Sequence, residues 1–148
     1  MRSRLAPLAA VVVLVHLAVS LGHGWAHATI PVRNSPAQNV FILVVITIAP
    51  LLAAWLVMRG RAAGGAALLA LSMLGSLVFG VAYHYVIQSP DHVAHVPAGD
   101  AGSVFRATAL ALAVVELAGL WIGALGFMRG SASGSAHAGD FAPRTPGR

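Results

Sequence analysis

Residues 104–128 read VFRATALALAVVELAGLWIGALGFM, an apolar segment in which Arg106 and Glu116 are the only charged side chains. The hydrocarbon core of a bilayer is about 30 Å thick, so a helix needs roughly 20 apolar residues to cross it. Three other segments meet this requirement, at about residues 5–28, 38–58 and 62–87. Their short connections favour antiparallel neighbours. The sequence therefore predicts an all-α integral membrane protein, an antiparallel bundle of four transmembrane helices within residues 1–129.

The composition excludes most soluble classes of protein. Of the 148 residues, 58% are hydrophobic and only 9% are charged, whereas a soluble domain carries about 25% charged residues. So few charges could not cover a water-facing surface, which excludes a soluble enzyme. The nine basic residues are all arginine and outnumber the four acids. They stand apart between apolar runs instead of forming a basic stripe, so we expect no nucleic-acid partner.

The arginines also predict the orientation of the helices, because cytoplasmic ends of membrane helices are enriched in Lys and Arg. Seven of the nine fall on one side of the predicted bundle: Arg2, Arg4, Arg59, Arg61, Arg129, Arg144 and Arg148. We therefore expect both termini to be cytoplasmic (N-in/C-in), with the protein integral to a bacterial or archaeal plasma membrane.

The two ends of the chain require separate interpretation. Residues 130–148 are rich in Gly, Ser, Ala and Pro and predict a disordered cytoplasmic tail. At the other end, Arg2 and Arg4, an apolar run and the sequence Ala26-His27-Ala28 also fit a secretory signal that ends in an A-x-A cleavage site. The apolar run exceeds the usual length of about 7–15 residues. This favours a retained helix, and cleavage stays an alternative.

Histidines are the most informative polar residues of the chain. There are seven, against four acids. His16, His23 and His27 are spaced by seven and four residues, so they share one face of a helix. His84 is expected near the extracytoplasmic end of the third span, close to the level of His23 and His27.

The loop that follows His84 adds two further histidines. Ser89 and Pro90 form a favourable helix start, with serine as the cap and proline at the first position. A short helix over residues 91–96 would then place His92 and His95 on one face. The sequence predicts that five histidines and one carboxylate gather on the extracytoplasmic side: His23, His27, His84, His92, His95 and Asp91.

Such a cluster has the chemistry of a metal site, since imidazole is the commonest metal ligand in proteins. Nitrogen ligands with a carboxylate and no sulfur suit copper(II) or zinc better than copper(I). Asp91 is either a ligand itself or an acceptor that orients a ligating imidazole. Haem b held between the first and third spans is a second interpretation. A third is that these histidines only reach water from the membrane interface.

Two ionisable residues are predicted inside the membrane. At a rise of about 1.5 Å per residue, His16 and Glu116 lie at matching depths from the cytoplasmic ends of their helices. We expect them to pair near the bilayer midplane. The pair serves either as a hydrogen bond that fixes helix register or as a proton relay.

Small residues at four-residue spacing predict where helices approach closely. One row lies on the third span and one on the fourth: Ser72, Ser76 and Gly80, and Gly119 and Gly123.

The leading functional hypothesis is a small membrane protein that binds copper, zinc or haem b, in electron transfer or metal handling. An alternative is an accessory or assembly subunit that joins other membrane subunits, or copies of itself, through its glycine and serine faces. A third is a proton-coupled carrier that uses His16 and Glu116. The chain contains no GxSxG, HExxH or phosphate-binding glycine loop, so enzymatic activity is not expected.

Overall fold

The computed structural model describes residues 2–30 and 32–138, and every regular element in these ranges is helical. The elements along the chain are α1 (Arg2–Thr29), α2 (Pro36–Phe41), η1 (Ile42–Ile48), α3 (Ala49–Met58), α4 (Ala62–Val81), η2 (Ala82–Val86) and α5 (Asp100–Ala138). The segments η1 and η2 are π-helical and continue their neighbours without a break. Four helical stretches are long and apolar enough to cross a membrane: Arg4–Thr29, Pro36–Met58, Ala62–Val86 and Asp100–Ser131.

The predicted all-helical class and the four long apolar helices are therefore confirmed. The fourth helix differs from its expected bounds at both ends. It begins at Asp100 and continues to Ala138, inside the segment for which a disordered tail was predicted. The remainder of that tail, 139–148, lies outside the described residues.

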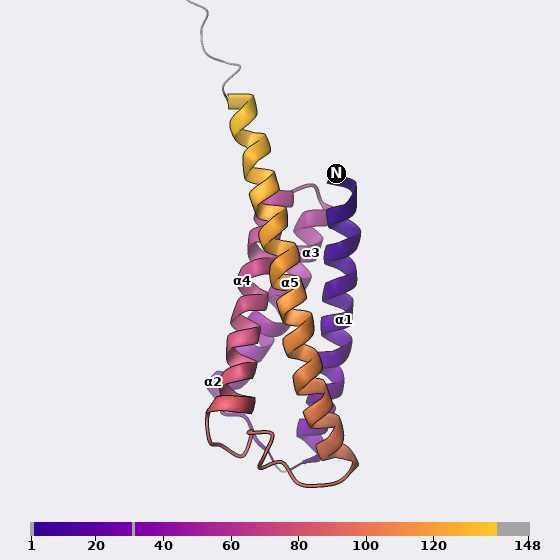
Figure 1. The fold of residues 1–148 in the computed structure, drawn as a ribbon, viewed down its shortest axis with the longest axis vertical. Coiled ribbons are helices and arrows are strands. Elements are labelled where there is room, and N and C mark those ends of the chain that lie inside the picture. Colours follow the sequence, from indigo (N-terminus) through magenta and orange to yellow (C-terminus); the bar gives the residue numbers. More distant parts are fainter. Residues whose placement is uncertain (1, 31, 139–148) are drawn as a thin grey trace, which may run out of the picture.

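The helices pack side by side in a bundle (Figure 1). Helix α1 packs against α5 and α3, while α4 packs against the same two helices, so α1 and α4 face each other across one diagonal. Helix α1 begins at the same end of the bundle at which α5 finishes. The opposite end carries the connections 30–35 and 87–99, and we call it the loop end.

Glycines allow the closest helix approach, between α4 and α5. A Cβ atom added to Gly123 would lie 2.5 Å from the backbone nitrogen of Ala70, and one added to Gly119 would lie 2.8 Å from the Met73 side chain. Ser72 is buried one turn from the cavity described below, and its hydroxyl donates to the Leu69 carbonyl at 3.1 Å. These small residues face the interior of the bundle.

The second span begins with a strong helix start and contains an irregular middle. Ser35 and Gln38 form a capping box, in which each side chain accepts a hydrogen bond from the backbone of the other. The π-helical η1 ends just before Pro50, which occupies the first turn of α3. Because η1 and α3 are continuous, Pro50 lies inside a longer helix, and it has no N–H to donate to the preceding turn. The irregular π-helical segment lies just before it.

The predicted short helix over residues 91–96 is wrong. This segment forms isolated turns, in which the backbone N–H of His95 donates to the His92 carbonyl at 2.8 Å. The physical reason is that contacts with η2 take the backbone groups that a helix would need. The N–H of Val93 donates to the His84 carbonyl at 3.0 Å, and the Asp91 carbonyl accepts from the His84 ring at 3.1 Å.

Candidate metal centre

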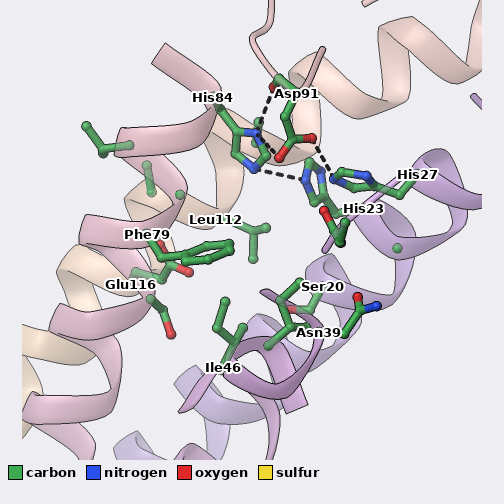
Figure 2. Close-up of a pocket in the computed structure, with 18 residues that line it drawn as sticks. Ser20, His23, His27, Asn39, Ile46, Phe79, His84, Asp91, Leu112 and Glu116 are labelled. Atoms are coloured by element: carbon green, nitrogen blue, oxygen red, sulfur yellow. Dashed lines mark hydrogen bonds and ion pairs between the residues drawn. The ribbon is translucent and has the colours of Figure 1, made fainter. Parts of the chain in front are cut away.

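Three histidines from two diagonal helices meet at the loop end of the bundle (Figure 2). His23 and His27 lie one turn apart on α1, and His84 lies on η2. One ring nitrogen from each falls within 4.8 Å of the other two, and we call this group the histidine triad. Phe105 of α5 covers all three rings, with centroid distances of 4.6, 4.9 and 5.2 Å. The triad is therefore set against a buried aromatic surface.

The ring of His23 is oriented by Thr108 of α5. The Nδ1 atom of His23 lies 2.9 Å from Thr108 Oγ1. Thr108 Oγ1 also lies 2.6 Å from the Val104 carbonyl and 3.1 Å from the Phe105 carbonyl, both of which only accept. With its one proton given to a carbonyl, Thr108 accepts from His23, which then donates from Nδ1. This assignment leaves His23 Nε2 as the nitrogen with a free lone pair.

The ring of His84 is oriented in the same way by a backbone carbonyl. Its Nδ1 atom lies 3.1 Å from the Asp91 oxygen, and a carbonyl oxygen only accepts. His84 therefore donates from Nδ1, and its Nε2 atom carries the free lone pair.

These two assignments place two lone pairs face to face. The Nε2 atoms of His23 and His84 lie 3.2 Å apart, and both are buried. Two neutral imidazoles with these tautomers would repel each other, and a metal ion held between the two lone pairs removes this repulsion.

Asp91 supplies negative charge beside this pair. Its Oδ1 atom lies 3.3 Å from His27 Nε2 in an ion pair that lacks hydrogen-bond alignment, and its Oδ2 atom lies 3.8 Å from His84 Nδ1. Asp91 Oδ1 and His27 Nδ1 are buried and have no hydrogen-bond partner among the described residues. Buried polar atoms of this kind call for a water molecule or an ion.

The structure places His92 and His95 apart from the triad. Their rings contact each other with centroids 5.2 Å apart and planes tilted by 41°. His92 Nε2 lies 3.2 Å from the Tyr85 carbonyl, and His95 Nδ1 lies 2.8 Å from the Ser89 carbonyl. These bonds tie the loop 87–99 to itself and to η2. The two residues are not members of the metal-compatible group.

His16 and Glu116 are in contact deeper in the bundle. His16 Nε2 lies 3.3 Å from Glu116 Oε1, and the residues are 1% and 3% exposed. The contact joins α1 to α5 and so fixes the register of these helices.

A cavity of about 220 Å³ joins the triad to Glu116. Figure 2 shows the three histidines and Asp91 at one end, with Glu116 at some distance from them along the same space. Apolar side chains from η1, α4 and α5 line its middle, among them Ile46, Phe79 and Leu112.

Thr108 and Phe105 were missed by the sequence analysis. Thr108 is 85 residues from His23 in the sequence, and no spacing rule connects them. A polar residue within an apolar span was the one available signal for Thr108. For Phe105, one aromatic residue in an apolar segment carries no such signal.

Comparison of the chain with protein-family models, curated proteins and solved structures finds no match. The function is therefore argued from the site itself.

Proposed function

We propose that this protein binds a divalent transition-metal ion within a membrane, with His23, His27 and His84 as ligands. Zinc and copper(II) are the ions that an all-imidazole set suits best. The observation that carries the proposal is the pair of Nε2 atoms 3.2 Å apart, with each Nδ1 atom beside an oxygen that can accept its proton. Metal-ligating histidines are held in this way, with the second ring nitrogen donating to a carbonyl, carboxylate or similar acceptor.

The separation of the two nitrogens supports the same conclusion. Ligands about 2.0–2.1 Å from a tetrahedral zinc ion lie about 3.3 Å from each other. The observed 3.2 Å is close to this distance, which supports an ion held between His23 and His84. His27 is the third ligand, and Asp91 orients His27 and His84.

A single ion fits the site better than haem b does. The two axial ligands of a haem iron stand on opposite faces of the macrocycle, which must pass between them. Here the two Nε2 atoms lie 3.2 Å apart, and Phe105 packs directly on both rings. This leaves no slot for a flat macrocycle at the triad.

Three protein ligands leave the fourth position of a tetrahedral ion open, as in sites that exchange a ligand. We propose that the open position faces the cavity and that the protein handles metal by taking up and releasing its ion. With both termini in the cytoplasm of a prokaryotic cell, the loop end and its triad face outward. Ser72, Gly119 and Gly123 are buried within the chain, and Ser76 and Gly80 line the cavity, so these five residues offer little surface to a partner subunit.

The test is metal binding by the full chain in mild detergent. Protein stripped with a chelator is titrated with Zn²⁺ and with Cu²⁺, and the retained ion is counted by elemental mass spectrometry. We expect one ion per chain. His84→Ala should weaken binding by about tenfold or more, because the pair of Nε2 atoms is lost. His95→Ala is the matched control, since it removes a histidine at the same end that bonds only to a backbone carbonyl.

Thermal unfolding of each metal-free variant shows whether it is folded. A folded wild-type protein that retains neither ion would contradict the proposal, as would equal loss in His84→Ala and His95→Ala. A Soret band in the absorption spectrum would overturn the choice of an ion over haem.

A further inference from the structure

A second cavity, of about 390 Å³, lies beside the first at the loop end. Its lining includes Arg33, Gln38 and Ser89, which belong to the connections or to the start of the second span. Asn34 and Asp91 line both cavities. The two cavities therefore follow one another from the loop end inward, with these two polar side chains at their junction.

The inner cavity contains hydroxyl groups without partners. The Oγ atoms of Ser20 and Ser76 are buried and have no hydrogen-bond partner among the described residues, and both residues line the cavity. Ser76 is 0% exposed. Buried polar atoms in native proteins are nearly always satisfied, and ordered water satisfies those that the chain does not. The cavity is large enough for several water molecules, since each occupies about 30 Å³ of liquid.

Glu116 lies at the inner end of this space. One carboxylate oxygen, Oε1, is held by His16, while Oε2 faces Gly80. A Cβ atom added to Gly80 would lie 3.9 Å from Glu116 Oε2 and 4.0 Å from the Cδ2 atom of His84. Because Gly80 has no side chain, the space between the triad and the carboxyl group of Glu116 is not filled at this position.

Beyond Glu116 the bundle is filled by apolar side chains. The core on that side consists of Ala9, Val12, Val13, Ala53, Ala54, Val57, Leu69 and Met73. The second cavity and a third one, lined by residues of 27–33, both lie at the loop end and do not extend into this core.

We propose that the two cavities form a water-filled half-channel through which Glu116 exchanges protons with the solution at the loop end alone. A proton carried by the water chain forms an O–H bond at Glu116 Oε2 and neutralises the carboxylate, and the reverse step returns it to water. Apart from Glu116, the ionisable groups that line the half-channel are His23, His27, His84, Asp91, Arg33 and Tyr83. His16 contacts Glu116 from α1. This half-channel does not require that the triad bind metal.

The absence of cysteine from the sequence gives a direct test of the water. Ser76→Cys and Ser72→Cys place the same thiol one turn apart on α4, the first in the cavity and the second in the dry interface. A thiol reacts as its thiolate, which forms only where water reaches it. The reagent is a small, cationic, membrane-impermeant thiosulfonate, added to either side of vesicles with oriented protein.

We expect Ser76→Cys to be labelled from the loop-end side and Ser72→Cys to remain unlabelled from both sides. Ser20→Cys, across the cavity on α1, repeats the test if the first variant does not fold. The half-channel is wrong if neither cavity thiol reacts, or if labelling proceeds from the opposite side.

Proton access is measured separately by infrared difference spectroscopy of the metal-free protein. The carboxyl band of Glu116 is identified by its loss in Glu116→Gln. It should respond to a pH change at the loop-end side only, and Gly80→Ile, which fills the passage, should slow that response. A response to the opposite side, or none in a labelled and folded protein, would overturn the proton path. Because no metal is present, these outcomes are independent of ion binding at the triad.

Discussion

Thr108 on α5 determines which nitrogen of His23 faces His84. The hydroxyl oxygen of Thr108 lies 2.6 Å from the Val104 carbonyl, which only accepts, and 2.9 Å from His23 Nδ1. With the Thr108 proton on that carbonyl, His23 donates from Nδ1 and its Nε2 lone pair faces η2. Helix α5 contributes none of the three histidines, yet its Thr108 orients the ring of His23 on α1.

The first prediction follows from this bond. Thr108→Val keeps the shape of the side chain but removes the acceptor, so the His23 ring loses its fixed tautomer. The loss of such an orienting partner weakens metal affinity by about 10–100-fold. Thr108→Ser retains the hydroxyl and should bind as the wild type does. Competition with a chromophoric chelator gives the affinities, and equal affinity in Thr108→Val and wild type would contradict the assignment.

Asp91 gives the second prediction. Asp91→Asn removes the negative charge beside His27 and His84 but leaves the backbone carbonyl that accepts from His84 Nδ1. Affinity should fall by about 10–100-fold, as for other orienting groups. Binding should still be detectable, unlike binding in His84→Ala. The exposed Asp100→Asn is the control, and isothermal titration would show it unchanged. An equal loss in both variants would indicate a general electrostatic effect.

The third prediction concerns pH. Protons compete with a metal ion for the Nε2 lone pairs of His23 and His84. Apparent affinity should therefore fall as pH falls, by up to about tenfold per pH unit for each proton displaced. Zinc affinity measured by chelator competition from about pH 8 to about pH 5.5 tests this, with the chelator corrected for its own protonation. His92→Ala should keep the same slope, and a flat profile in the wild type would speak against imidazole ligands.

The fourth prediction concerns packing between α4 and α5. At Gly123 an added Cβ atom would meet the Ala70 backbone nitrogen at 2.5 Å, and backbone does not move aside easily. Gly123→Ala should lower the free energy of unfolding by about 1–3 kcal/mol, the usual cost of overpacking. Gly64→Ala on α4 is the matched control, because an added Cβ atom there meets nothing within 4 Å. Unfolding in mixed detergent micelles measures both, and equal stability would show that the helices do not approach so closely.

The four long apolar helices could be predicted from the sequence, because the thickness of a bilayer sets how long an apolar segment must be to cross it. Periodicity also placed His23 and His27 on one face, since residues four apart on a helix always share it. The depth of His16 and Glu116 followed from the helical rise. Each of these inferences rests on geometry within a single element.

The conformation of the loop could not be obtained in this way. The sequence Ser89-Pro90 is a favourable helix start, but the backbone of residues 91–93 bonds to η2 instead. Those bonds depend on where η2 ends, and hence on a π-helical turn that no hydrophobic pattern indicates. The separation of His92 and His95 from the triad has the same origin, because a loop without helical periodicity does not carry its side chains to a predictable face.

The residues that form and orient the triad are far apart in the sequence, and therefore in the order of synthesis. His23 and His84 are 61 residues apart, and His23 and Thr108 are 85 apart. Membrane helices are inserted first and associate afterwards. In a chain inserted in this order, the helix that carries His23 would be placed before its partners are made, and the His23 ring would gain a fixed orientation only when the last helix docks. Retention of an ion by the nascent protein would consequently mark the completion of its assembly.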